Sequence, residues 1–154
     1  MTMVVGDKAP SFKMPADGGG ELSLDALKGK AVILYFYPKD DTPGCTKEAC
    51  GFRDASPDFS AANAAIIGVS KDSVAKHDKF KAKYDLPFAL GVDEDGAVCE
   101  AYGTWVEKSM YGRKYMGIER ATFLIDGEGV LRGAWRKVKV NGHVDAVLAA
   151  TKDL

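Results

Sequence analysis

The sequence predicts an α/β fold in which helices cover both faces of a central mixed β-sheet. Two short apolar runs, Ala31–Tyr37 and Ala64–Ser70, have the length and uniform hydrophobicity of strands buried on both faces. Helical patterns alternate with these runs, which is typical of parallel strands joined by crossover helices. The last two strands are expected to form a hairpin, and this antiparallel pair makes the sheet mixed. No repeat or linker divides the sequence, so residues 1–154 are predicted to form a single domain.

The N-terminal part is expected to contain the first strand and the first helix. An extended entry segment, Gly6–Met14, and a glycine-rich loop, Pro15–Gly20, precede the strand. After the strand, a helix is predicted to begin near Thr42 and to run toward Asp54. Pro57 is placed beyond the end of this helix, because proline interrupts helix interiors.

The middle of the sequence predicts two more strands and two helices. The Ala64–Ser70 run is the second strand, and Ser73 is a favourable N-cap for a helix that runs through Tyr84. Phe88–Val92 is predicted to be the third strand, and a short helix is expected around Val98–Tyr102.

The C-terminal part predicts a hairpin and a final helix. The strands Ala121–Ile125 and Val130–Arg136 flank Asp126–Gly129, whose Asp-Gly-Glu-Gly sequence is a strong hairpin signal. His143–Thr151 carries apolar residues on one side and is predicted to be the last helix.

Composition and charge exclude several classes of function. The chain is 46% hydrophobic and 28% charged, and its net charge of −1 gives no electrostatic basis for nucleic-acid binding. No apolar run approaches the length of a membrane span, and Met1–Pro10 lacks the features of a secretory signal. We therefore expect a cytoplasmic protein that binds neither nucleic acid nor membranes.

Three cysteines, Cys45, Cys50 and Cys99, direct attention to redox chemistry. An odd number of cysteines in a cytoplasmic chain argues against a structural disulfide framework, so at least one thiol is free. Neither His77 nor His143 has a zinc-type spacing to these cysteines, and no metal site is expected.

Cys45 lies at a helix start that favours a reactive thiolate. Thr42 is a favourable N-cap, and Pro43 suits the first helical position because its missing N–H costs nothing there. Cys45 then falls in the first turn, where unpaired N–H groups and the positive end of the helix dipole favour a negative sulfur. We expect the Thr42 hydroxyl to donate to this sulfur or to a bound ligand, and Gly44 to let that ligand approach the backbone. Cys45 is therefore a candidate nucleophile.

Cys50 follows five positions later on the same predicted helix. Ideal helix geometry separates the Cα atoms of residues i and i+5 by roughly 8.7 Å, whereas a disulfide requires less than about 7 Å. Cys45 and Cys50 can therefore bond only if the helix unwinds locally, and Gly51, a poor helix former, lowers the cost of that opening. The alternative is that Cys50 is a core thiol that packs without reacting.

The segment Thr42–Thr46 reads Thr-Pro-Gly-Cys-Thr, and Pro38 lies upstream of it. This pattern resembles the peroxidatic-cysteine signature of the peroxiredoxins, in particular the bacterioferritin comigratory protein or PrxQ subfamily. Cys50 stands at the resolving position used when both cysteines share one helix. The likeness covers almost the whole chain. The other matching segments are Tyr102–Trp105, Tyr111–Arg113, Met116–Arg120 and Thr122–Asp126.

The resemblance implies a thioredoxin-like fold that uses no metal and no organic cofactor. It assigns Cys45 as the peroxidatic cysteine and Cys50 as the resolving cysteine. Pro38, Thr42 and Arg120 would complete the pocket, with the Arg120 guanidinium stabilising the thiolate and polarising the peroxide. Arg120 directly precedes a predicted central strand, which supports this role; an exposed surface arginine is the alternative.

The implied activity is that of a thiol-dependent peroxidase acting on hydrogen peroxide and organic hydroperoxides. Cys45 attacks the O–O bond and becomes a sulfenic acid, with which Cys50 condenses after local unfolding. Thioredoxin then restores both thiols by exchange. The subfamily also implies a monomer or a weak homodimer.

Two other functions remain open from the sequence. A thioredoxin-type disulfide reductase would need Cys-x-x-Cys, whereas here four residues separate Cys45 from Cys50. A non-enzymatic redox sensor or holdase, in which oxidation of Cys45 changes partner binding, is compatible with the same motif. Repeated turnover with thioredoxin separates an enzyme from a sensor that is oxidised once.

Three other side chains are expected to have structural roles. Cys99 is predicted to be a small buried side chain in a short helix, with a back-up resolving thiol or an intermolecular disulfide as alternatives. His77 shares a helix face with apolar residues and is predicted to be packed. Glu48, three residues after Cys45, is expected to lie on a solvated helix face, with a contact to the site as the alternative.

Overall fold

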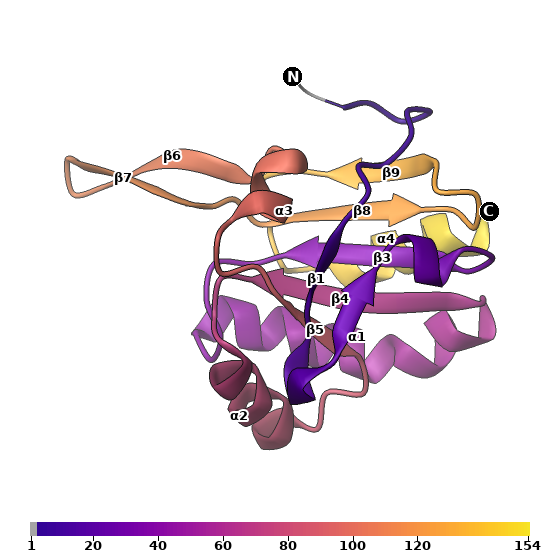
Figure 1. Cartoon of the computed structure of the whole chain (residues 1–154), viewed down its shortest axis with the longest axis horizontal. Coiled ribbons are helices and arrows are strands. Elements are labelled where there is room, and N and C mark those ends of the chain that lie inside the picture. The colour runs from indigo at the N-terminus through magenta and orange to yellow at the C-terminus, as the bar shows by residue number, and fades with distance from the viewer. Residues whose placement is uncertain (1–2) are drawn as a thin grey trace.

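A computed structural model describes residues 3–154 of the chain, and Figure 1 shows its arrangement. In chain order, the strands and helices are β1 (Lys13–Pro15), β2 (Glu21–Ser23), β3 (Ala31–Phe36), α1 (Pro43–Ala61), β4 (Ala64–Ser70), α2 (Val74–Tyr84), β5 (Ala89–Val92), α3 (Ala97–Ala101), β6 (Trp105–Met110), β7 (Arg113–Ile118), β8 (Ala121–Ile125), β9 (Leu131–Trp135) and α4 (His143–Lys152).

The main sheet has five strands in the order β5-β4-β3-β8-β9. Strands β3, β4 and β5 run parallel, whereas β8 pairs antiparallel with both β3 and β9. The predicted mixed sheet is therefore confirmed. The turn Asp126–Gly129 joins β8 to β9 as a hairpin, as the sequence indicates.

Each face of the sheet carries its own apolar cluster. Side chains of β3 alternate between them: Ile33 and Tyr35 lie in one cluster, and Leu34 and Phe36 in the other. Helices α1, α2 and α4 pack into the first cluster, while α3 and the N-terminal segment pack into the second. The expectation of helices on both faces is confirmed.

Helix α1 is longer than the sequence predicts. The expected end near Asp54 is wrong, because α1 continues through Pro57 to Ala61. Proline removes one backbone hydrogen bond from a helix interior and crowds the preceding turn. Here the burial of Phe59, whose side chain is completely enclosed in the core beyond the proline, offsets that cost.

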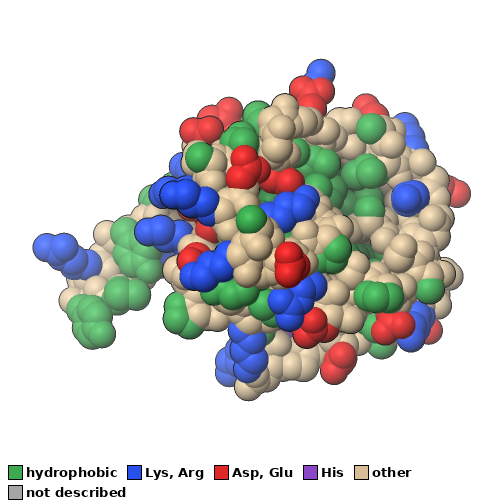
Figure 2. Space-filling model, turned by 90° about the horizontal axis from the view of Figure 1, so that it is seen from below, with side chains coloured by type: hydrophobic (Ala, Val, Ile, Leu, Met, Phe, Trp, Pro, Cys, Tyr) green, Lys and Arg blue, Asp and Glu red, His purple; other side chains and the backbone are tan. Residues whose placement is uncertain are grey.

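Two hairpins outside the main sheet are not predicted by the sequence. Strands β1 and β2 pair within the region expected to be an extended segment and a loop. Strands β6 and β7 form an arm that projects from the body (Figure 1 and Figure 2), on which Met110, Tyr111, Tyr115 and Met116 are exposed. Because the arm buries no complete face, its sequence lacks the apolar alternation that marks a strand.

The helix starts agree with the sequence. Ser73 precedes α2 in an extended conformation, and its hydroxyl oxygen accepts a hydrogen bond from the Lys76 N–H at 3.3 Å. Helix α4 begins at His143, where the last helix is expected. Within residues 3–154, no helix is both long and apolar enough to cross a membrane.

Candidate active site

The Cys45 thiol lies where three chain segments meet at one end of the sheet. Strand β3 ends at Phe36, and the first residue of antiparallel β8, Ala121, lies opposite Phe36. Arg120 immediately precedes β8, so the pairing brings it beside the loop that leads from β3 into α1. Cys45 is the third residue of α1. The sheet topology thus joins two residues that are 75 positions apart in sequence.

Arg120 contacts the Cys45 sulfur directly. Its Nη2 donates a hydrogen bond to Sγ over 3.2 Å, and Cys45 is only 1% exposed. A Cβ atom on residue Gly44 would lie 3.1 Å from the same Nη2, so glycine leaves the space that the guanidinium occupies. The sequence predicts that Gly44 leaves room for a ligand to approach the backbone. In the structure, the Arg120 side chain occupies that room. The alternative of an exposed surface arginine is wrong.

Glu48 holds the other arm of the guanidinium. Arg120 Nη1 donates to Glu48 Oε1 over 2.7 Å, and Glu48 is completely buried. Burial raises the pKa of Glu48 to about 7, although the Arg120 charge acts to lower it. The expectation of a solvated position for Glu48 is wrong. Its spacing of three residues from Cys45, which places both on one helix face, was the available signal.

The positive charge beside the sulfur resides on Arg120. Burial opposes that charge, yet Glu48 and Cys45 together raise the pKa of Arg120. His143 is neutral at neutral pH, because burial and the Arg120 charge lower its pKa to about 4. Its Nε2 atom lies 2.7 Å from Thr122 Oγ1 and 4.0 Å from Glu48 Oε2.

Thr42 and Pro38 lie in the segment that leads from β3 into α1. Thr42 is the N-cap residue of α1 and Pro43 its first helical residue, as predicted. Within the described part of the chain, however, the Thr42 hydroxyl accepts no cap bond and makes no bond to sulfur; it donates to the Lys39 carbonyl at 2.9 Å. Pro38 follows β3 and is exposed. The backbone of Thr42 therefore starts the helix, and its hydroxyl closes the preceding loop.

Cys50 lies on the same continuous helix as Cys45 but on another side of it. Cys50 is half-buried and lines a groove of about 650 Å³ between α1 and α4, whereas Cys45 packs toward the sheet. Both thiols are free. A Cβ atom on residue Gly51 would lie 3.0 Å from Val144 Cγ2, so this glycine also lets α4 pack closely on α1. A bond between the two sulfurs requires α1 to unwind, since intact helix geometry keeps the Cα atoms roughly 8.7 Å apart.

Cys99 lies on the opposite face of the sheet from Cys45. It is completely buried in the second apolar cluster, and its N–H donates to Asp93 Oδ2 at 2.8 Å. Burial, followed by the nearby Asp93 carboxylate, raises the pKa of the Cys99 thiol. The prediction of a small packed side chain is confirmed.

One cluster within residues 3–154 has the residue types of a metal site. Asp40, Asp72 and His77 each place a potential ligand atom within 4.8 Å of the others. His77 Nδ1, however, is 2.6 Å from Asp40 Oδ2 and is hydrogen-bonded directly to it. The cluster supports the loop that precedes α1.

The chain matches a known family over most of its length. Residues 5–134 match the model of the AhpC/TSA family. A putative peroxiredoxin bcp of Coxiella burnetii is 62% identical over 148 residues, which are 96% of this chain and 98% of the relative. Peroxiredoxin Bcp of Bacillus subtilis is 53% identical over 154 residues, which are 100% of this chain and 98% of the relative.

Solved structures share the fold. The bacterioferritin comigratory protein of Xanthomonas campestris, studied for alkyl peroxide reduction, superposes with a TM-score of 0.88 at 49% identity, covering 92% of this chain and 90% of that chain. A mutant PrxQ of Xylella fastidiosa superposes with a TM-score of 0.94 at 39% identity, covering 99% of this chain and 98% of that chain. The predicted thioredoxin-like fold is confirmed.

Proposed function

Because this chain belongs to the AhpC/TSA family and is a peroxiredoxin, we propose that Cys45, Cys50 and Arg120 carry out its thiol peroxidase activity. One observation carries this assignment: the half-buried Arg120 guanidinium donates to the Cys45 sulfur and to a carboxylate at the same time. A sulfur held against a fixed positive charge at a helix start is the arrangement that a thiolate nucleophile requires.

In the first step, the Cys45 thiolate attacks one oxygen of a hydroperoxide. An S–O bond forms, the O–O bond breaks, and the other oxygen leaves as water or an alcohol after taking a proton; the sulfur becomes a sulfenic acid. Arg120 stabilises the thiolate and polarises the breaking bond, because its guanidinium is always charged and carries several N–H donors. Pro38 and Thr42 form the approach, and the Thr42 hydroxyl can turn from the Lys39 carbonyl to a bound peroxide.

Glu48 sets the direction of the guanidinium. Its Oε1 accepts from Nη1 of Arg120, which aims Nη2 at the sulfur. Because the guanidinium is planar, fixing Nη1 also fixes the direction of Nη2. This preorganisation lowers the activation free energy of the reaction.

The second and third steps return Cys45 to the thiol. After the first turns of α1 unwind, the Cys50 thiol attacks the sulfenic sulfur, an S–S bond forms and water leaves. A dithiol protein, thioredoxin, then reduces this disulfide by exchange and is itself oxidised.

The substrates we propose are hydrogen peroxide and organic hydroperoxides. The similarity to the Xanthomonas campestris protein studied for alkyl peroxide reduction supports the organic class. We expect the enzyme to act as a monomer or a weak homodimer, and sedimentation at two protein concentrations measures which state is present.

Substitution of the resolving cysteine tests the proposed cycle. In Cys50→Ser, Cys45 should react with one equivalent of hydrogen peroxide as in the parent protein, because the attacking sulfur and Arg120 are unchanged. Turnover driven by thioredoxin and its reductase should be lost, since no intramolecular disulfide can form. Cys45→Ser should lose both reactions. Unimpaired thioredoxin turnover in Cys50→Ser would contradict the role of Cys50, and a single oxidation without turnover in the parent would identify a sensor.

A further inference from the structure

His77 is a buried ionisable side chain that the proposed cycle does not use. It lies in α2 and is completely buried. Its Nδ1 is 2.6 Å from Asp40 Oδ2, and its Nε2 is 2.8 Å from the Gly91 carbonyl oxygen. The Gly91 carbonyl oxygen only accepts hydrogen bonds, and so does an ionised Asp40 carboxylate, so with Asp40 ionised both ring nitrogens carry protons. His77 paired with an ionised Asp40 is therefore an imidazolium.

The environment of His77 agrees with this protonation state. Burial alone would lower the pKa of His77, but the hydrogen bond and charge of Asp40 raise it above its ordinary value. His77 and Asp40 thus form a buried ion pair in which each charge is neutralised by the other. Breaking one side of such a pair leaves a buried charge without a partner.

Asp40 is bound on every side. Its Oδ1 accepts from the Tyr37 hydroxyl at 2.5 Å, and its Oδ2 accepts from His77. Its backbone N–H donates to Asp72 Oδ2 at 2.8 Å, and the same Asp72 oxygen accepts from the Ser70 hydroxyl at 2.6 Å. Asp40 therefore ties together Tyr37, which directly follows β3, the β4–α2 connection and α2.

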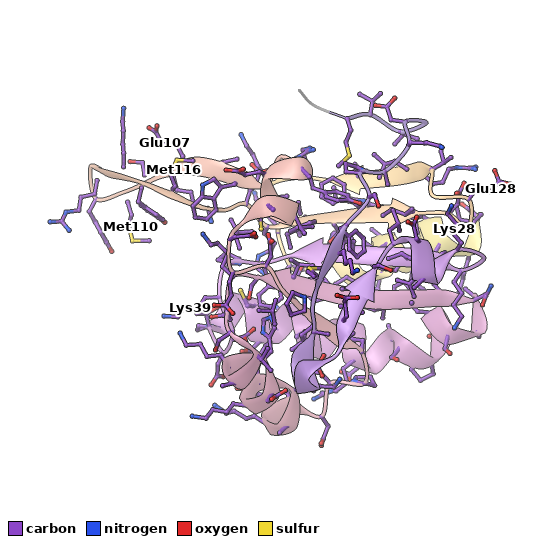
Figure 3. The ribbon with its side chains drawn as sticks, in the orientation of Figure 1. Lys28, Lys39, Glu107, Met110, Met116 and Glu128 are labelled. Atoms are coloured by element: carbon purple, nitrogen blue, oxygen red, sulfur yellow. The ribbon has the colours of Figure 1, made fainter. Side chains whose placement is uncertain are left out.

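Asp40 lies in the loop that leads into α1, the helix that carries Cys45. The loop joins the end of β3 to Thr42, and its Lys39 and the distant Lys28 lie on opposite sides of the body of the molecule (Figure 3). Asp41 adopts a left-handed conformation with φ of 60° and pairs with Lys83 of α2 at 2.9 Å. Helix α2 thus holds the loop at two consecutive residues, one contact buried and one exposed. The start of α1, and with it the direction of the Cys45 sulfur, follows from how this loop is held.

A metal ion does not account for the same cluster. Two ligands of a tetrahedral zinc ion, each about 2.1 Å from it, lie roughly 3.4 Å apart. The separation between His77 Nδ1 and Asp40 Oδ2 is 2.6 Å, which is a direct hydrogen bond. The other ring nitrogen is occupied by the Gly91 carbonyl.

We propose that His77 is a positioning residue for the peroxidatic cysteine: paired with Asp40, it fixes the loop before α1 and thereby the place of Cys45 beside Arg120. This inference rests on the proposed role of Cys45 as the peroxide-reactive thiol. It assigns a reaction-rate effect to a side chain in α2 that touches neither substrate nor sulfur.

The test compares the second-order rate constant of Cys45 oxidation by hydrogen peroxide in His77→Gln, in Asp40→Asn and in the double variant. Each single variant should react about 10- to 100-fold more slowly than the parent, because small displacements of a reacting group cost rates of this size. The double variant should be no slower than the slower single variant, since both changes break one contact. All rates are measured well below the unfolding midpoint of each variant.

Two features make the result decisive. A purely electrostatic effect on the thiolate would slow His77→Gln but speed Asp40→Asn, because the latter removes a negative charge near the site. Val98→Ala, in the apolar cluster on the opposite face of the sheet, controls for lost stability and should react within twofold of the parent. An unchanged or faster Asp40→Asn, an equal slowing in Val98→Ala, or a parent rate that changes when zinc is added or chelated would overturn the proposal. An unreactive Cys45 in the parent would instead refute the proposed function.

Discussion

At the Cys45 sulfur, one arginine side chain serves two groups. Arg120 directs Nη2 to the sulfur and Nη1 to Glu48, and both contacts are short. A lysine ammonium carries the same charge but is a compact point on a flexible stem, so it cannot hold both positions in a fixed plane. We therefore expect the geometry of the guanidinium, and not its charge alone, to matter for catalysis.

Arg120→Lys should lower the second-order rate constant for hydrogen peroxide by a factor on the order of 100, the usual effect of removing one preorganised donor. Competition kinetics against a reference peroxidase measures this constant. Arg132→Lys is the matched control, because Arg132 forms an ion pair with Asp126 away from the thiol and its substitution should leave the rate unchanged. A rate for Arg120→Lys equal to that of the parent would show that charge alone suffices.

Glu48 should impose a pH dependence on stability. Its pKa is about 7 in the folded protein and 4.5 in the unfolded chain, so its contribution is fully present below pH 4.5 and is lost as the pH rises through 7. Glu48→Gln lacks this ionisable carboxyl group, so position 48 no longer makes its free energy of unfolding depend on pH. The free energy of unfolding of Glu48→Gln, relative to the parent, should therefore rise by up to roughly 3 kcal/mol between pH 4.5 and pH 8. Urea unfolding at several pH values measures the difference, and a difference independent of pH would contradict this account.

The sequence identifies some site residues and conceals others for a physical reason. Cys45 stands in a local motif at a helix start, so its role can be read from its neighbours in sequence. Glu48 and His77 depend on partners that only the fold supplies: Arg120 lies 72 positions from Glu48, and Asp40 lies 37 positions from His77. Charged side chains are rarely buried unless they are paired, so a sequence that does not reveal the partners predicts an exposed or uncharged position.

The proposed cycle requires helix α1 to be stable in one state and open in another. It holds Cys45 against the sheet when reduced, but it must unwind before Cys50 can reach the sulfenic sulfur. Gly51 bears on both states. It is a poor helix former, and it also leaves room for Val144 of α4.

Replacing Gly51 in a background that removes the steric conflict should slow disulfide formation. Alanine stabilises a helix interior by about 1 kcal/mol relative to glycine. Gly51→Ala combined with Val144→Ala should therefore form the Cys45–Cys50 disulfide about fivefold more slowly than Val144→Ala alone, because opening of α1 precedes bond formation. Rapid quenching with a thiol-specific alkylating reagent follows the reaction. Equal rates would mean that α1 opening does not limit the step.

The elements differ in how well the sequence predicts them. Strands β3 and β4 are buried on both faces, and their continuous apolar runs mark them clearly. The end of α1 was predicted too early, because Pro57 is a local signal whereas burial of Phe59 is a tertiary effect. The β6–β7 arm has no buried face and hence no apolar pattern to detect.

Across the whole molecule, the central sheet separates the Cys45 thiol from the Cys99 thiol. Cys45 and Cys99 lie in different apolar clusters on opposite faces. Neither can reach the other without disrupting the central strands. We therefore expect the proposed redox cycle to be confined to the face covered by α1, α2 and α4.

Cys99→Ser should retain the peroxidase cycle while losing stability. Thioredoxin-driven turnover should stay within twofold of the parent, because Cys99 is remote from the site. Its free energy of unfolding should fall by about 1–3 kcal/mol, since a hydroxyl replaces a buried thiol in an apolar cluster. Non-reducing gels after peroxide treatment should show the same species as the parent. Loss of turnover, or loss of a disulfide-linked dimer seen in the parent, would instead give Cys99 a redox role.

The Cys45–Cys50 cycle is tested most directly by the intact mass and free-thiol count of the unmodified protein before and after one equivalent of hydrogen peroxide. Each chain should lose two thiols and the mass of two hydrogen atoms, and peptide mapping should place the new disulfide between Cys45 and Cys50. Three unreacted thiols would contradict it, and a disulfide that includes Cys99 would contradict the assignment of Cys50.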